Sequence, residues 1–452
     1  MPASENYSTL RNWLILLLPS LLGVFLFMTP IPAEKGLTIP VAVMANQLKM
    51  TLGSWMPYLL AFIVTVSAVL TLGVKLLKPA KIPPSSFAGK LFSPGWGWVV
   101  VRVLGAVLLL MVLSGQGPAF ITSQATGALV LNDLLPVLLS VFVFAGLLLP
   151  LLLNFGLLEF VGTLMTKIMR PVFRLPGRSA VDCIASWIGD GSVGILLTSK
   201  QYEAGFYTAR EAAVIGTTFS AVSVTFCIVV LGQVRLEHMF LPFYATICSA
   251  GLVAAIVLPY LPPLRGKPDT YIDGVDHMRA EGGQFSQTSV FSRAVAHGLH
   301  RASQASGFRA TLREGVEAVL DMLFGILPVI MAVGTMALII AEHTSVFSIL
   351  GAPFVPLLEL LQIPYPDQAA KSVMVGFADM FVPSILVSEV PSELTRFVIA
   401  ALSVTQLIYM SEVGALLLGS KIPVTLLDLF VLFILRTLIT LPVIAGMAHL
   451  MF

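Results

Sequence analysis

Charged residues are scarce in this chain: they make up 11% of its 452 residues, while hydrophobic residues make up 57%. Soluble globular domains carry about 25% charged residues, so this composition excludes an ordinary water-soluble protein. The chain also lacks an excess of either charge, because 26 Lys and Arg stand against 24 Asp and Glu. A net charge of +2 gives no reason to expect a nucleic-acid partner. The expected surroundings are therefore a lipid bilayer.

Cysteine and the common cofactor motifs are also scarce. Cys183, Cys227 and Cys248 lie in apolar segments and indicate neither a disulfide framework nor a zinc site. The sequence has no His-Glu-x-x-His motif and no Gly-x4-Gly-Lys-Ser/Thr motif, which excludes those metalloproteases and nucleotide-driven pumps. His297 and His300 have metal-like spacing without a third ligand nearby. We expect no metal and no resident cofactor, although coupling to Na⁺ or H⁺ is compatible with the sequence.

Long apolar segments predict nine membrane-spanning helices, because about 20 apolar residues cross a bilayer as a helix. The predicted spans are residues 12–28, 55–77, 97–113, 134–160, 208–232, 241–262, 315–341, 394–419 and 424–446. Two further apolar stretches, 180–199 and 368–390, are interrupted by Gly, Pro and Asp. Each predicts a re-entrant pair of short helices joined by a tight turn. The expected fold class is an all-α polytopic membrane protein with about nine spans and two opposed re-entrant hairpins.

Basic residues gather in three linkers, at 75–90, 167–178 and 265–313. The alternate linkers, around 114–133 and 233–240, carry a single basic residue between them. Because positive charge marks cytoplasmic loops, this pattern places the N-terminus in the cytoplasm. The first helix lacks a small-x-small cleavage site and is expected to stay uncleaved. The expected location is a bacterial inner membrane.

The interrupted stretches divide the chain into two similar halves. The expected units are N-terminal helices at 1–133, a first repeat at 134–262, a cytoplasmic linker at 263–314 with an interfacial helix near 290–312, and a second repeat at 315–452. The predicted topology makes the hairpins enter from opposite sides of the membrane. Corresponding interrupted segments in inverted halves are typical of a transporter binding site.

One aspartate lies at the break of each interrupted stretch. Asp190 stands in Gly189-Asp-Gly-Ser-Val-Gly194, and Asp379 precedes Met380-Phe-Val-Pro-Ser384. A carboxylate at membrane depth costs about 2.5–3.5 kcal/mol on insertion scales, so it needs a partner, a proton or a cation. Two roles remain open for each residue: it binds solute or a cation, or it caps the second short helix of its hairpin.

Polar residues continue beyond each hairpin. At helical spacing, Thr405, Tyr409 and Glu412 would share one face of the second half, as would Thr217, Ser220, Ser223 and Cys227 in the first. Such hydroxyls also serve helix packing in membranes. The amide of Gln406 and the carboxylate of Glu412 need partners if buried, and Lys421 is one candidate for Glu412. Thr208 and Glu211 predict a capping box, and Tyr202 and Glu203 are candidates to gate or line the site.

The stretch from Asp182 to Gly232, including Trp187-Ile-Gly-Asp-Gly-Ser-Val-Gly, resembles the YjiH family of bacterial inner-membrane proteins. That family belongs to the group with nucleoside-recognition Gate domains, which includes concentrative nucleoside transporters. The resemblance implies Gate-like regions near 145–235 and 325–420, with a substrate held between hairpins and broken helices. By matching position it implies a site near Asp190, Ser192, Thr217, Thr218, Ser220, Asp379, Ser384 and Gln406, to which we add Glu412.

These observations predict a secondary transporter that moves a small polar solute, such as a nucleoside, an amino acid or a small peptide, by alternating access. The Asn and Glu arrangement of nucleoside carriers is not evident, so the substrate stays open. A non-transporting membrane scaffold or signalling partner is the alternative function. An enzyme is not expected, since Trp187-Ile-Gly-Asp190 lacks the first glycine of the intramembrane aspartyl protease motif. The oligomeric state is open, a homo-oligomer included.

Overall fold

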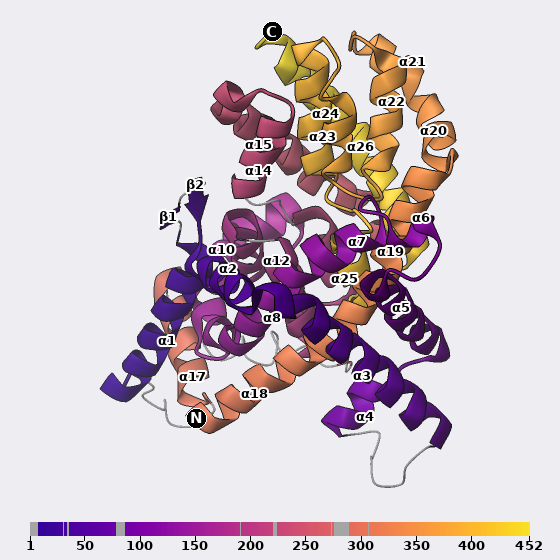
Figure 1. Cartoon of the computed structure of the whole chain (residues 1–452). Helices are drawn as coiled ribbons and strands as arrows, with labels where there is room; N and C mark the ends of the chain where they lie inside the picture. Colours follow the sequence, from indigo (N-terminus) through magenta and orange to yellow (C-terminus); the bar gives the residue numbers. More distant parts are fainter. Residues whose placement is uncertain are drawn as a thin grey trace.

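The computed structural model describes residues 8–452 apart from 30, 34–35, 78–85, 190, 220–223, 273, 275–288 and 306. The described chain is almost entirely helical (Figure 1). The exception among these residues is an antiparallel pair, β1 (Ile31–Ala33) and β2 (Gly36–Thr38), in which Ile31 pairs with Thr38. The chain is an all-α polytopic membrane protein, as the sequence predicts.

Seven helical segments in the described part of the chain are long and apolar enough to cross a membrane. They are Leu10–Met28, Pro40–Leu77, Trp96–Ser114, Ala119–Leu153, Phe240–Tyr260, Phe308–His343 and Leu426–His449. The first of them, α1 (Leu10–Met28), leaves Leu18 and Leu21 64% and 61% exposed. Exposed leucines on one helix are costly in water but not in hydrocarbon, so this surface suits lipid.

Seven of the nine predicted spans correspond to these segments; of the other two, 394–419 is interrupted, and 208–232 is described on either side of residues 220–223. Predicted span 208–232 consists of two short helices, and so does predicted span 394–419. The four helices are α13 (Ala209–Val214), α14 (Val224–Gln233), α24 (Glu393–Gln406) and α25 (Val413–Gly419). The predicted capping box does begin α13, where the hydroxyl of Thr208 accepts from the N–H of Glu211 at 3.2 Å.

Both interrupted stretches form pairs of short helices that pack against each other. The first pair is α11 (Ser179–Ile184) and α12 (Gly191–Glu203), and the second is α22 (Pro366–Val375) and α23 (Val382–Val387). The order of short helix, break and short helix is the predicted one, with ends shifted by a few residues. We refer to these pairs as the first and second hairpins.

The remaining elements complete the bundle around the hairpins. In the first part they are α2 (Pro40–Leu52), α3 (Met56–Leu77), α4 (Phe87–Phe92), α5 (Trp96–Ser114), α6 (Ala119–Thr122), α7 (Gly127–Leu129), α8 (Leu135–Leu148), α9 (Pro150–Leu153), α10 (Leu157–Phe173) and α15 (Phe240–Val257). In the second part they are α17 (Val290–Ser303), α18 (Phe308–Asp321), α19 (Leu327–His343), α20 (Val346–Gly351), α21 (Val355–Leu360) and α26 (Leu426–His449). π-Helical turns occupy Val130–Leu134, Ala185–Gly189, Ile215–Phe219 and Met322–Ile326. Single 3₁₀ turns occupy Gly53–Trp55, Glu237–Met239, Leu258–Tyr260, Leu264–Gly266 and Ala352–Phe354.

The predicted interfacial helix near 290–312 is two helices, because α17 ends at Ser303 and α18 begins at Phe308. Helix α17 packs against α1 and α10 (Figure 1). Its contact with the chain before α10 needs a glycine: Gly156 has φ +98°, and a Cβ there would lie 2.3 Å from the carbonyl oxygen of Gly298. The linker helix is therefore part of the packed structure.

Helix α26 contacts both halves. It packs against α15 of the first half and α24 of the second, and Phe433 on its inner face is fully buried. Helix α19 packs in turn against α5. Helix α26 thus packs against a continuous helix of the first part of the chain and against one arm of the broken helix of the second.

Candidate functional site

The second hairpin meets its broken helix at the two breaks. Helix α24 ends at Gln406 because Leu407 adopts a left-handed conformation with φ +59°. The chain that follows turns back onto the hairpin, where the N–H of Met410 donates to the carbonyl oxygen of Phe377 at 2.8 Å. The N–H of Ser411 donates to the carbonyl oxygen of Ala378 at 2.9 Å. Backbone groups freed by one break therefore satisfy those freed by the other.

Asp379 lies at this junction and is 6% exposed. Its Oδ1 accepts from the N–H groups of Phe381 and Val382 at 2.8 and 3.2 Å. Its Oδ2 accepts from the hydroxyl of Ser411 at 2.7 Å. The carboxylate thus caps α23 and ties the hairpin to the broken helix, which is one of the two roles that the sequence leaves open.

Two other predicted residues pack close to Asp379. Ser384 is buried and donates from Oγ to the carbonyl oxygen of Phe381 at 2.6 Å. Gln406 donates from Nε2 to the carbonyl oxygen of Val373 at 3.0 Å and to Thr437 Oγ1 at 2.9 Å. The side chain of Gln406 therefore links the end of α24 to the second hairpin and to α26.

The predicted shared face of Thr405, Tyr409 and Glu412 is wrong. The helix ends at Gln406, so helical spacing does not continue to the last two residues. Tyr409 Oη instead donates to Glu412 Oε2 at 3.4 Å within the break. The segment from Leu407 to Ser411 contains neither glycine nor proline, so no residue in it indicates a break.

The first hairpin also contacts the helical segment that follows it. The indole N–H of Trp187, at the end of the first hairpin's opening arm, donates to the carbonyl oxygen of Phe219 at 3.0 Å. Ser192 is buried in the first turn of α12. Asp190 and Ser220, which the sequence predicts beside it, lie outside the described residues.

Thr217 and Thr218 are buried in the π-helical turn that follows α13. Their hydroxyls donate to carbonyl oxygens one turn earlier, Thr217 to Ala213 at 2.7 Å and Thr218 to Val214 at 2.6 Å. Their own carbonyl oxygens face away from that turn, toward α26. The threonine hydroxyls therefore form hydrogen bonds within their own helix, and the backbone carbonyl oxygens are the groups that face α26.

Arg436 lies between these carbonyl oxygens and the end of α24. It lies within the 24 residues of α26 and is 2% exposed. Its Nη1 donates to the carbonyl oxygens of Thr218 at 3.1 Å and Thr217 at 3.5 Å, and its Nε donates to that of Thr405. One guanidinium thus binds carbonyls of the π-helical turn after α13 and of the last turn of α24. Carbonyls at helix ends carry partial negative charge, which favours a cation there.

Arg436 is not among the predicted site residues, because those come from the interrupted segments and Arg436 lies in a continuous span beside them. The available signal was an arginine at the middle of an apolar helix, which is expensive in a membrane and indicates function by itself. Asp182 in the first hairpin is also absent from the predicted site residues. Asp182 is 1% exposed, and its Oδ2 accepts from Thr198 Oγ1 at 2.9 Å and Tyr207 Oη at 3.0 Å.

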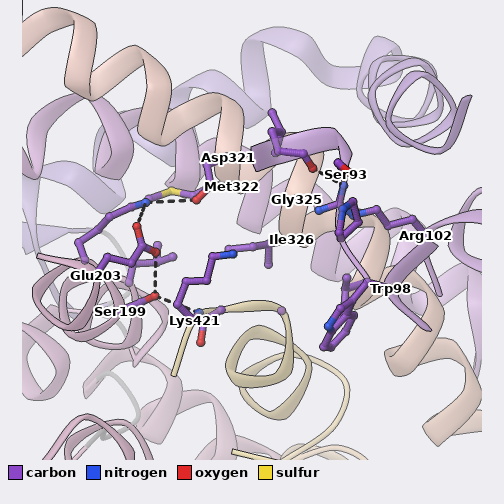
Figure 2. Close-up of a pocket in the computed structure, with 17 residues that line it drawn as sticks. Ser93, Trp98, Arg102, Ser199, Glu203, Asp321, Met322, Gly325, Ile326 and Lys421 are labelled. Atoms are coloured by element: carbon purple, nitrogen blue, oxygen red, sulfur yellow. Dashed lines mark hydrogen bonds and ion pairs between the residues drawn. The ribbon is translucent and has the colours of Figure 1, made fainter. Parts of the chain in front are cut away.

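A polar cavity of about 340 Å³ lies between the first hairpin, the start of the second half and α5 (Figure 2). Five charged residues line it: Arg102, Lys200, Glu203, Asp321 and Lys421. Lys200 Nζ lies 3.1 Å from Glu203 Oε2 and 3.1 Å from Asp321 Oδ2. Burial alone would lower the pKa of Lys200, but the neighbouring carboxylates outweigh it and hold that pKa above its ordinary value.

The two gating candidates differ in position. Glu203 lines the cavity, whereas Tyr202 is 8% exposed and is not among its lining residues. The ion pair of Lys200 with Asp321 crosses from the first hairpin to the helix that opens the second half. In the described part of the chain, no group of three or more His, Cys, Asp or Glu side chains is placed to hold a metal ion.

Comparison with known proteins identifies a matching domain family and a full-length relative. The family described as "Gate: Nucleoside recognition" matches residues 135–237, which run from α8 through the first hairpin and its broken helix. An uncharacterized protein of Alkalihalophilus pseudofirmus (BpOF4_10220) is 49% identical over 451 residues, covering 99% of this chain and 96% of that protein. The chain belongs to the same family as that protein. The Gate match and the membrane-type helical fold point to a transporter and not to an enzyme.

Proposed function

We propose that this protein is a secondary transporter that moves a small polar solute across the bacterial inner membrane by alternating access, with Na⁺ or H⁺ as the coupling ion. The candidate solutes are a nucleoside, an amino acid and a small peptide. The observation that carries the proposal is Arg436, which binds carbonyls of Thr218 and Thr405 from the interrupted helices of both halves. Broken helices at membrane depth are tolerated where they line a cavity or face protein, and transporters use them to bind solute.

The solute would lie where the breaks converge. The residues proposed to line or shape this place are Asp190, Ser192, Thr217, Thr218, Ser220, Asp379, Ser384, Gln406 and Glu412. Since the carboxylate of Asp379 and the amide of Gln406 already bind protein groups, their proposed part is to position the backbone around the solute. Glu203 and Tyr202 would control access from the cavity side.

The charge-based topology supports this arrangement. With the N-terminus in the cytoplasm, Arg102, Lys200, Asp321 and Lys421 all fall near the cytoplasmic ends of their segments. The four come from separate parts of the sequence, and the fold brings them to one cavity. The repeats at 134–262 and 315–452, their inverted orientation and the likeness to the YjiH family remain part of the proposal.

A thermal-unfolding screen of the purified protein tests the function. Nucleosides, amino acids and dipeptides would each be titrated with and without Na⁺ and at several pH values. Binding to the folded state raises Tm by mass action, so at least one class is expected to stabilise the protein. If no solute shifts Tm under any of these conditions, the transporter proposal fails and a membrane scaffold becomes the better account.

A further inference from the structure

The polar cavity separates its charges into two groups. On one side, Lys200 is shared between Glu203 and Asp321, at 3.1 Å to each, which leaves that group with one negative charge in excess. Arg102 and Lys421 also line the cavity, and no salt bridge joins either of them to a carboxylate in the described part of the chain, although Arg102 lies close enough to Asp321 to be attracted by its charge. Figure 2 shows the side chain of Lys421 reaching into the space between Glu203 and Arg102.

Arg102 is held in place by protein groups. Its Nη1 donates to the carbonyl oxygen of Leu91 at 2.8 Å and to Thr71 Oγ1 at 3.0 Å. These bonds fix the guanidinium through two uncharged acceptors, and Asp321, beside Gly325, is the carboxylate that attracts it. A cation that is 7% exposed and fixed in this way is preorganised for an anionic partner.

Gly325 lies between the two charge groups. A Cβ built there would lie 3.5 Å from Asp321 Oδ1 and 3.6 Å from Arg102 Nη2. An acidic oxygen and a guanidinium nitrogen therefore border the same small space. The absence of a side chain at Gly325 leaves that space open.

We propose that this cavity is a second solute site, on the access side of the converging breaks, and that it binds a small zwitterion, an amino acid carrying one free ammonium and one free carboxylate. The carboxylate lies between Arg102 and Lys421, and the ammonium lies on the side of Glu203 and Asp321. The inference rests on the proposed transport function and names its substrate class. A volume of about 340 Å³ is at the small end for ligand pockets, which suits a single amino acid. Trp98 and Ile326 offer apolar surface for its side chain.

An uncharged nucleoside fits this cavity less well. It would leave Arg102 and Lys421 without an anion, and the separation of charge would have no counterpart in the ligand. A simple monocarboxylate would satisfy the two cations but not the acidic side. The charge pattern therefore favours a zwitterion over an uncharged nucleoside and over a simple monocarboxylate.

The test measures uptake into proteoliposomes and Tm shifts of the purified full chain. The probes are L-alanine, L-leucine and L-serine, with butyrate, butylamine, uridine and adenosine as the contrasting set. We expect the amino acids to bind and to be taken up, and the compounds lacking either charge to bind at least about tenfold more weakly. Uptake of uridine or adenosine without uptake of any amino acid would overturn the zwitterion inference and leave the transporter intact. No uptake of any probe would overturn both.

Variants locate the binding to the cavity. Lys421→Gln removes a cation without an ion-pair partner among the described residues, so the fold is expected to tolerate it while amino-acid binding weakens about tenfold. Gly325→Leu fills the space between Asp321 and Arg102 and should abolish binding. Lys371→Gln, at an exposed position on α22, is the matched control. Amino-acid affinity unchanged in both cavity variants would overturn the inference.

Discussion

Arg436 Nη1 lies 3.1 Å from the carbonyl oxygen of Thr218, and the same guanidinium reaches the carbonyl of Thr405 through Nε. The two threonines belong to the interrupted helices of different halves. A helix break at membrane depth leaves carbonyls that lipid cannot satisfy. Arg436 satisfies such a carbonyl at the break after α24 and also binds the π-helical turn after α13, so any relative movement of these two segments must change its contacts.

Replacing Arg436 tests this relationship. Arg436→Gln should lower the free energy of unfolding by about 3 kcal/mol, because buried carbonyls left without donors cost about 1–3 kcal/mol each. Arg436→Lys should fall between, since one ammonium cannot reproduce the spread of a guanidinium. The control is Arg235→Gln, whose ion pair with Glu389 is 67% and 81% exposed and should contribute little. Equal unfolding curves for the Arg436 and Arg235 variants would refute a stabilising role for the hydrogen bonds of Arg436.

The two roles of Asp379 can be separated by substitution. Asp379→Asn keeps an oxygen for the N–H groups of Phe381 and Val382, so stability should change little. Asp379→Ala removes the cap and should cost about 1 kcal/mol. We expect solute binding to follow stability, retained in the first variant and weakened in the second. A complete loss of binding in Asp379→Asn, with unchanged Tm, would instead assign the charge itself to a solute or a cation.

The linker helix should respond to acid through His297. Burial and the neighbouring charge of Arg293 lower the pKa of His297 below its ordinary value, and its Nδ1 lies 3.1 Å from Thr163 Oγ1 on α10. A histidine whose folded-state pKa is lowered destabilises the fold as pH falls below its unfolded pKa of about 6.5. The fall in Tm from pH 7 to pH 5 should therefore be smaller in His297→Gln than in wild type. His238→Gln, at an exposed site, should follow wild type, and identical losses in all three would reject this assignment.

The pair Lys200 and Asp321 offers a way to lock the halves together. In a background with the three cysteines replaced, Lys200→Cys with Asp321→Cys would be joined by a short bifunctional thiol reagent. If the halves move apart here during transport, the cross-link should stop uptake while a cleavable reagent restores it after reduction. Each single cysteine variant, treated alike, controls for modification. Full uptake by quantitatively cross-linked protein would show that this contact stays closed throughout the cycle.

The sequence predicted the features that depend on local chemistry. Composition gave the membrane class, Gly, Pro and Asp marked both hairpins, and the spacing of Thr208 and Glu211 gave a capping box whose return bond, from the N–H of Thr208 to Glu211 Oε2, is 3.0 Å. Each of these signals arises from residues within a turn or two of one another, so the pattern along the chain is enough to read them.

Features that depend on distant contacts could not be read in this way. Arg436 binds backbone oxygens, which no side-chain pattern records, and its partners in the first half lie more than 200 positions away, at sequence separations of 218 and 219. Helix α24 breaks at Leu407 through tertiary hydrogen bonds to Phe377 and Ala378, without a breaker residue. Helix α2 was missed because Asn46, Gln47 and Lys49 make it less apolar than its neighbours.

Uptake into proteoliposomes by wild type, Arg436→Gln and Arg235→Gln tests the central claim most directly. Radiolabelled nucleosides, amino acids and dipeptides would be offered under inward Na⁺ and H⁺ gradients. We predict gradient-dependent uptake of at least one class by wild type and by Arg235→Gln, and none by Arg436→Gln. No uptake by wild type under either gradient, or equal uptake by all three proteins, would contradict a transporter whose halves are coupled through Arg436.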